Sequence, residues 1–247
     1  MQSVTDLAAA VRDADDVVAF TGAGVSTASG IPDFRSESGV WNRFDPADFH
    51  YDRFRSDPAG FWTERVDLHE TMFGDGVAPN AAHDAIDDLA DAGHVDAVVT
   101  QNTDGLHVGT PAALVELHGN ADRVVCESCG RRSDAGPVHE RVRAGEAVPP
   151  RCDDCGGLLK PDVVLFGEQL PQMDLSQARS WARRADVFVA AGSSLTVEPA
   201  ASLPRMAADG GATTAVVNLD STPFDDRADA RFRDDVTDVL PALADAV

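Results

Sequence analysis

Five apolar segments of strand length recur along this chain, and they constrain its fold more than any other feature. They are rich in valine and do not alternate with polar residues; they span residues 17–21, 95–100, 113–118, 186–192 and 213–220. A strand with one face in water alternates, whereas a strand that is covered on both faces is apolar throughout. We therefore expect a mostly parallel central sheet that is covered on both faces.

Helical patterns fill much of the chain between these segments; they span residues 5–14, 80–93, 174–185 and 235–247. The second pattern begins at Asn80, a good helix N-cap, and stops at Gly93. Strands that alternate with helices predict an α/β fold with a doubly wound sheet. Residues 31–79 and 121–160 lack this alternation. We expect these two regions to form a smaller domain against the sheet.

The cysteines form two C-x-x-C pairs, and a glycine follows each pair; they are Cys126, Cys129, Cys152 and Cys155. This paired spacing is typical of a zinc ribbon, in which four thiolates leave no open coordination position. The predicted zinc site is therefore structural. Two disulfides are an alternative that a reducing cytosol disfavours. A redox pair is a second alternative, but a redox C-x-x-C usually occurs singly on a strand–helix turn.

The chain of 247 residues is strongly acidic, with a formal net charge of −22 and Lys160 as its only lysine. Such a charge repels nucleic acid, so we expect no direct nucleic-acid binding. The acids are spread along the whole chain, which is typical of a surface adapted to high salt, where charges are screened over about 3 Å at 1 M. No segment approaches the roughly 20 apolar residues of a membrane span, and the N-terminus lacks the features of a signal peptide. We expect a monomer in a high-salt cytosol, with no membrane contact.

Small or hydrogen-bonding residues follow all five predicted strands, at the sheet edge where α/β proteins bind ligands. The loop after the first strand is "GAGVSTASGIPDFR", residues 22–35, whose first glycines let the backbone approach a phosphate. Thr27 stands where a dinucleotide fingerprint has its third glycine. The other strand ends carry Gln101, Asn102 and Asp104, then His118, then Gly192, Ser193 and Ser194, and last Asn218 and Asp220. Together these residues predict a dinucleotide site.

His118 ends a predicted strand among these groups, which favours a role as general base. Its ordinary pKa of about 6.5 suits the removal of a proton from a hydroxyl near neutral pH. His107, in the same region, is the competing candidate.

The sequence resembles the sirtuins, the Sir2-type NAD-dependent protein deacylases, over about residues 5–245. The resemblance rests on "GAGVSTASGIPDFR", "TQNTDGLH", "LHG", the paired C-x-x-C motifs, "KPDVVLFGE", "GSSLTVEPA" and "VNLD", in this order. It implies a Rossmann-like NAD-binding domain of residues 1–30, 80–120 and 161–247. It also implies a small domain, in which residues 31–79 form a helical module with the cofactor loop and residues 121–160 form a zinc ribbon. The acidic composition indicates a haloarchaeal type of member.

The resemblance implies that NAD and an acetyl-lysine protein meet in the cleft between the two domains. The acetyl oxygen attacks the nicotinamide ribose carbon and nicotinamide leaves. His118 then activates a ribose hydroxyl, which attacks the resulting alkylimidate. The products are free lysine, nicotinamide and O-acetyl-ADP-ribose.

Residue roles follow from the same resemblance. The catalytic group is His118, Asn102 and Asp104. Phe34 would shield the reacting carbon and Arg35 would help to hold the phosphates. The whole cofactor group is Gly22, Ala23, Gly24, Ser26, Thr27, Asp33, Phe34, Arg35, Trp41, Gln101, Asn102, Thr103, Asp104, Gly192, Ser193, Ser194, Asn218, Leu219, Asp220 and Val236. Two strands that sandwich the substrate peptide are Val164, Leu165, Phe166, Gly167 and Glu168, and Val197, Glu198 and Pro199.

The chain departs from the sirtuin pattern in places. Thr103 replaces an expected isoleucine that lines the nicotinamide pocket, so inhibition by nicotinamide is expected to differ. Sirtuins that remove succinyl or malonyl groups carry a Tyr-x-x-Arg pair, and this chain has Arg65-x-x-Leu68 there. The missing pair predicts a neutral acyl group, such as acetyl. Alternative functions are mono-ADP-ribosyl transfer to proteins and non-catalytic binding of NAD or ADP-ribose. A dehydrogenase is disfavoured by the missing third glycine and by the zinc ribbon.

Overall fold

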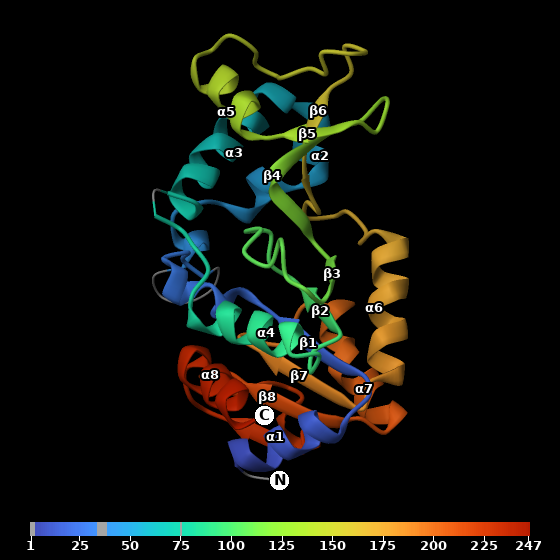
Figure 1. The fold of residues 1–247 in the computed structure, drawn as a ribbon. Coiled ribbons are helices and arrows are strands. Elements are labelled where there is room, and N and C mark those ends of the chain that lie inside the picture. The colour runs from blue at the N-terminus through green and yellow to red at the C-terminus, as the bar shows by residue number, and fades with distance from the viewer. Residues whose placement is uncertain (1–2, 34–38, 75) are drawn as a thin grey trace.

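Six parallel strands form the central sheet of the computed structural model, which describes residues 3–33, 39–74 and 76–247 (Figure 1). Neighbouring strands follow the order β3 (Ala113–Glu116), β2 (Ala97–Thr100), β1 (Val17–Thr21), β7 (Val187–Ala191), β8 (Thr213–Val217) and β9 (Ala230–Phe232). Every neighbouring pair is parallel. This is the Rossmann strand order, in which the two halves of the sheet meet at β1 and β7. The predicted doubly wound parallel sheet is confirmed.

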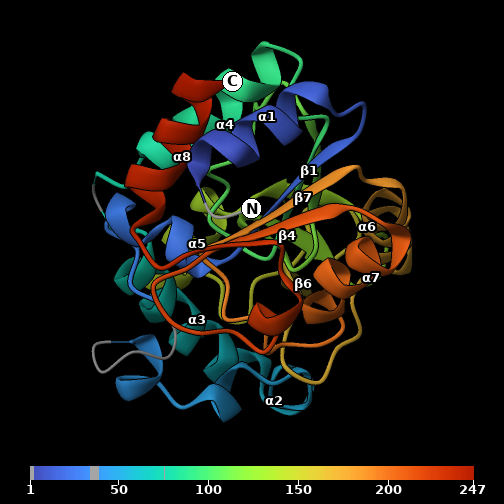
Figure 2. The ribbon, with the colours of Figure 1, turned by 90° about the horizontal axis from the view of Figure 1, so that it is seen from below.

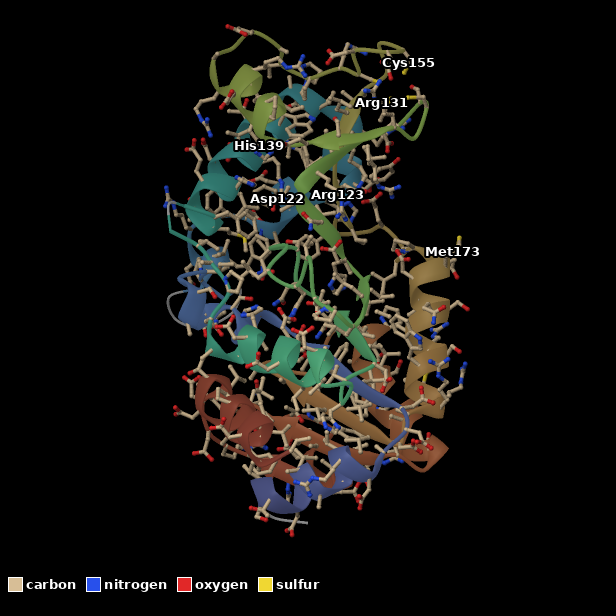
Figure 3. The ribbon with its side chains drawn as sticks, viewed as in Figure 1. Asp122, Arg123, Arg131, His139, Cys155 and Met173 are labelled. Atoms are coloured by element: carbon tan, nitrogen blue, oxygen red, sulfur yellow. The ribbon has the colours of Figure 1, made fainter. Side chains whose placement is uncertain are left out.

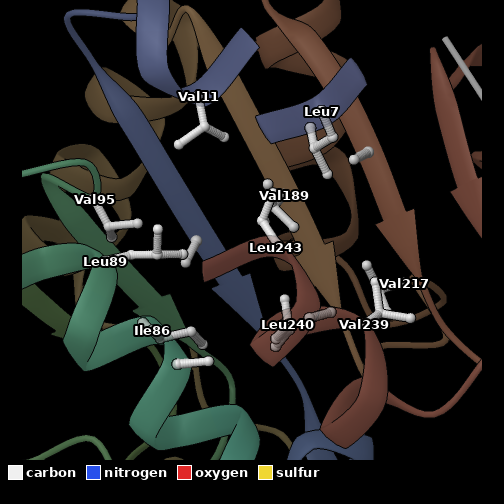
Figure 4. Packing of buried hydrophobic residues seen from close by; sticks show 14 of the residues in the cluster. Leu7, Val11, Ile86, Leu89, Val95, Val189, Val217, Val239, Leu240 and Leu243 are labelled. Carbon is white, nitrogen blue, oxygen red and sulfur yellow. The ribbon is translucent and has the colours of Figure 1, made fainter. Parts of the chain in front are cut away.

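Helices cover both faces of this sheet (Figure 2). One face carries α1 (Val4–Asp13), α4 (Ala81–Asp91) and α8 (Val236–Ala246), and their apolar side chains pack against Val189 of β7 (Figure 4). The other face carries α6 (Gln172–Arg184) and α7 (Leu203–Gly210), which pack against Phe188. Because neighbouring side chains of a strand point to opposite faces, β7 serves both cores. This explains its unbroken apolar sequence.

Side-chain caps determine where the covering helices begin. Ser3 accepts a hydrogen bond from the N–H of Asp6 at the start of α1, and Asn80 accepts one from Ala82 at the start of α4. Asp235 caps α8 in the same way. Such caps satisfy backbone donors that the first helical turn leaves without partners. The predicted start of a helix at Asn80 is confirmed.

The rest of the molecule, called the small part below, lies above the large sheet in the view of Figure 1. It contains α2 (Tyr51–Ser56), α3 (Pro58–Met72), α5 (Gly136–Arg143) and an antiparallel sheet of β5 (Arg132–Asp134), β4 (Gly119–Cys126) and β6 (Leu159–Val163). Phe54, Phe61 and Trp62 are fully buried in its core. The antiparallel sheet runs from residue 119 to 163, slightly beyond the predicted 121–160 module. The proposed domain boundaries themselves remain predictions.

Several local expectations were wrong. β3 is an edge strand whose Ala113 is exposed, so it is not covered on both faces. β9, α7 and the antiparallel sheet were not predicted. The two predicted peptide-binding segments are not regular strands among the described residues: Phe166 forms an isolated parallel bridge with His50, and Val197–Pro199 forms a bend and turn. Their role in binding a peptide stays a prediction.

Among the helices of the described residues, none has the length and apolarity that a membrane crossing requires.

Candidate active site

The carboxyl ends of β1 and β7 are neighbours, and glycines hold the two following loops together. The N–H of Gly24 donates to the carbonyl of Gly192 at 2.8 Å, and the N–H of Gly22 donates to Ala191. A Cβ on Gly24 would lie 2.9 Å from the Cα of Gly192, and Gly192 itself has a φ of +61°. Only glycine fits this contact without strain. The strand order reverses here, which is where open α/β sheets bind ligands.

Ser26 ties the glycine loop to the segment that follows β2. Its hydroxyl donates to Asp104 Oδ2 at 2.7 Å. The Nδ2 of Asn102 donates to Ser26 Oγ and to the carbonyl of Gly22, both at 3.1 Å. The other carboxylate oxygen of Asp104 accepts from the N–H of Leu106. Asp104 therefore holds these two loops in place.

His118 lies at the end of β3, between the large sheet and β4. Its Nδ1 is 2.7 Å from the carbonyl oxygen of Gln101. Because a carbonyl oxygen can only accept, Nδ1 carries the proton and Nε2 is left as the acceptor. Burial lowers the pKa of His118, although the bond to Gln101 opposes this shift. The ring is therefore neutral at neutral pH and has one basic nitrogen available.

His107, the competing candidate, belongs to the core. Its Nε2 lies 3.1 Å from the hydroxyl of Thr21, and its ring packs on His83 with centroids 4.8 Å apart. Burial lowers the pKa of His107 to about 3. It is 3% exposed and does not line the cleft. The structure thus favours His118 over His107 as the general base.

One cleft of about 540 Å³ runs along these strand ends. It is lined by the following predicted residues: Gly22, Ala23, Gly24, Thr27, Asp33, Trp41, Gln101, Asn102, Thr103, His118, Val164, Leu165, Phe166, Gly192, Ser193, Ser194, Val197, Asn218, Leu219, Asp220 and Val236. The predicted residues that do not line it are Ser26, Asp104, Gly167, Glu168, Glu198 and Pro199. Phe34 and Arg35 lie outside the described residues. Residues that follow strands far apart in the sequence therefore line one cavity, as predicted.

Six residues that line the cleft were not predicted, and most of them come from residues 31–79: Phe49, Arg65, Leu68, Met72, Val163 and Asp235. On α3, the spacing of 65, 68 and 72 places three of them on one helix face. That periodicity was visible in the sequence. Nothing in it indicated that this face meets the sheet edge.

The segment after β6 is positioned by an ion pair that includes the only lysine. Lys160 is 8% exposed, and its Nζ donates to Glu168 Oε2 at 2.9 Å and to the carbonyl of Val163 at 2.7 Å. The same Glu168 oxygen accepts from the N–H of Leu165 at 2.8 Å. Glu168 therefore does not line the cleft itself but fixes the backbone of Leu165, which does. The ring of Phe166 packs against that of Trp41 with centroids 5.6 Å apart and planes inclined by 59°, which connects this segment to the small part of the molecule.

The four cysteines converge at the end of the molecule farthest from the large sheet, where Figure 3 labels Cys155. Their sulfur atoms all lie within 4.8 Å of one another, with 3.5 Å between Cys126 and Cys155 and 3.9 Å between Cys129 and Cys152. A disulfide requires about 2.05 Å, so these cysteines form no disulfide. Four sulfurs about 2.3 Å from one centre form the tetrahedral set that zinc prefers. The residues fit a structural zinc ion.

The strand order, the glycine contact and the cleft define a nucleotide-binding α/β protein with an added four-cysteine module. Residues 22–199 match the family model described as "Sir2 family". The chain belongs to the Sir2 family.

Its similarity to known proteins extends over nearly the whole chain. It is 53% identical over 247 residues to the "NAD-dependent protein deacetylase" of Haloarcula marismortui, covering 99% of this chain and 94% of that protein. It is 41% identical over 233 residues to "NAD-dependent protein deacylase 2" of Archaeoglobus fulgidus, covering 93% and 90% of the two chains. The solved structure described as "Sir2-p53 peptide-NAD+" superposes with a TM-score of 0.87 at 33% identity, covering 99% and 98%.

Proposed function

We propose that this chain is an NAD-dependent protein-lysine deacetylase whose products are free lysine, nicotinamide and O-acetyl-ADP-ribose. The observation that carries the proposal is the position of His118. It lines the cleft, its Nδ1 proton is engaged by Gln101, and its Nε2 is left as a base. The names of the relatives from Haloarcula marismortui and Archaeoglobus fulgidus support this activity.

When bound, NAD supplies a ribose carbon whose bond to nicotinamide breaks as the acetyl oxygen attacks. The chain's residues hold and orient the reactants. The glycine loop, Ser193 and Ser194 offer N–H and hydroxyl donors to the phosphates. Asn102, fixed by Gly22 and Ser26, orients the nicotinamide end. His118 accepts the proton of a ribose hydroxyl at Nε2, and its lowered pKa keeps it ready to do so at neutral pH.

Acetyl-lysine proteins are the proposed second substrates, and they lie between the segment after β6 and the turn at Val197. Phe166 and Val197 are large apolar side chains that are 46% and 40% exposed at the cleft. An extended peptide placed there is held mainly through its backbone, so recognition reads little sequence. The cysteine cluster would hold one zinc ion, which stabilises the small part of the molecule and takes no part in the reaction.

The setting proposed for the enzyme is a high-salt cytosol, in which it works as a monomer and without nucleic acid. A net charge of −22 on 247 residues supports this. Strong self-repulsion requires screening, so the fold should loosen when salt is removed. Circular dichroism during dialysis into low salt tests the idea. A fold that is fully stable there contradicts it.

Mass spectrometry of a modified protein substrate incubated with NAD tests the function. Deacetylation removes the mass of an acetyl group, whereas mono-ADP-ribosyl transfer adds the mass of ADP-ribose. A non-catalytic NAD-binding module changes neither. The proposal requires loss of acetyl together with release of nicotinamide.

A further inference from the structure

A buried arginine faces the cleft from the helical side of the molecule. Arg65 of α3 is 6% exposed and lines the cleft together with Leu68 and Met72 of the same helix. Phe49, Leu68, Met72 and Leu165, which line the same cleft, belong to one buried hydrophobic cluster. A guanidinium is rarely buried among such groups unless a partner balances its charge.

Arg65 has no such partner in the part of the chain that the structure describes. Its Nε and Nη2 are buried and make no hydrogen bond, and no carboxylate forms an ion pair with it. Other arginines do find acids: Arg123, for example, contacts Glu116 at 2.8 Å and Asp162 at 3.1 Å. With 42 acidic residues against 20 basic ones, partners are plentiful in this chain. The isolation of Arg65 is therefore a local feature of the cleft.

The guanidinium of Arg65 remains a cation within the cleft. Desolvation lowers the pKa of Arg65 to about 10, which still leaves it protonated at neutral pH. A buried cation with free donors is best satisfied by a carboxylate, which can accept two parallel hydrogen bonds from the guanidinium. A neutral acetyl group supplies no such charge.

We propose that Arg65 binds the carboxylate of an acyl group, so that the enzyme removes succinyl as well as acetyl groups from lysine. This inference rests on the deacetylase function proposed above. The expectation of neutral acyl groups considered only a Tyr-x-x-Arg pair, which is absent. Arg65 stands at the first position of that motif and supplies the cation from there.

The bond changes are those of deacetylation. The amide bond between the acyl carbon and the lysine nitrogen breaks, and so does the bond between nicotinamide and ribose. The acyl group ends as an ester on a ribose hydroxyl, and water supplies the remaining oxygen and protons. No oxidation or reduction takes place. Arg65 acts remote from the reacting carbon, so its effect should lie mainly in KM.

The test compares kcat/KM for succinyl-lysine and acetyl-lysine in one peptide without Asp or Glu and with an amidated C-terminus, in molar KCl. The acyl group is then the only carboxylate on the peptide. Wild-type enzyme is compared with Arg65→Met and Arg65→Lys, and with Arg205→Met, an exposed site on α7, as the control. Melting curves establish that each variant is folded.

The ratio of succinyl to acetyl kcat/KM should fall at least tenfold in Arg65→Met, recover in part in Arg65→Lys and stay unchanged in the control. A wild-type enzyme that deacetylates but does not desuccinylate overturns this inference alone. An equal loss on both peptides assigns Arg65 a structural role and also overturns it. If neither acyl group is removed, the proposed function itself fails.

Discussion

The Nδ1 of His118 donates to the main-chain carbonyl of Gln101 across 2.7 Å, which joins the end of β3 to the end of β2. A side chain that follows one strand is thus oriented by the backbone that follows the neighbouring strand. This relation sets the tautomer of the ring and leaves Nε2 as its basic nitrogen.

The pH dependence of kcat/KM follows from this histidine. Only neutral His118 can act as a base, and burial lowers its pKa below the ordinary 6.5. Activity should therefore fall on the acid side of neutral pH with a midpoint below 6.5, the ordinary value for histidine. A pH profile on an acetyl-lysine peptide checks this, over the range in which circular dichroism shows a folded enzyme. An acid limb centred above pH 6.5 would count against His118 as the buried base.

Gly192→Ala should damage the cofactor site. An added Cβ would lie 2.3 Å from the N of Val25, and the backbone has a φ of +61°. We expect a loss of stability of about 1–3 kcal/mol and a weakening of NAD binding of tenfold or more. Calorimetry of NAD binding and thermal melting measure both. Gly74→Ala is the matched control, because its added Cβ would meet only the Glu70 carbonyl at an ordinary 3.5 Å.

Zinc removal should destabilise the small part of the molecule. We expect one zinc ion per chain by elemental analysis, and none in Cys155→Ser. The variant should lose about 4 kcal/mol of stability or more, since metal binding contributes directly to folding. The control is Ser133→Ala, at an exposed position on β5, which should retain the ion. A metal-free wild-type chain with full stability would refute the structural role.

Two buried histidines should make the fold sensitive to acid. Burial lowers the pKa of His107 and of His139 to about 3, whereas the unfolded value is about 6.5. The unfolded chain therefore binds more protons between these values, and stability should decrease as the pH falls through this range. The slope is about 1.4 kcal/mol per pH unit for each histidine. Unfolding in urea at pH 7.5, 6 and 5 measures it.

His139→Phe isolates one of these contributions. The ring packs on Trp62 and His69, and its Nε2 is buried without a hydrogen bond, so a phenyl ring suits the site. The variant should show a shallower loss of stability with acid. Ser133→Ala, which removes no titratable group and lies at an exposed position on β5, should keep the wild-type slope. An unchanged slope in His139→Phe would show that this histidine titrates in the folded protein.

The large sheet was predictable because its strands are short, buried and separated by helices. Val18 and Phe188 lie on strands whose both faces are covered, so their apolar runs are unbroken. β5 could not be found in this way, since its three residues are all exposed. β9 is also only three residues long, and its burial alternates. Such strands are defined by their partners rather than by their own sequence.

The candidate site also contains residues that could be predicted from the sequence and features that could not. Residues at strand ends could be placed together because the carboxyl ends of parallel strands meet at one edge. The hydrogen bond from Ser26 to Asp104 could not be predicted, because it depends on side-chain orientation, and the role of Asp104 at the ligand stays a prediction. Arg65 was considered only as a failed match to a motif. Its burial and its lack of a partner arise from the packing of α3 against the cleft, which no local pattern reveals.

The proposed deacetylation is tested by the stoichiometry of one reaction, followed in wild-type enzyme and in His118→Ala. An acetyl-lysine peptide is incubated with NAD in molar KCl, and nicotinamide and free-lysine peptide are quantified together. We expect equal amounts of the two from wild type, and a rate at least about 100-fold lower in His118→Ala with NAD binding retained. Nicotinamide release without deacetylation, or a variant as fast as wild type, would contradict it.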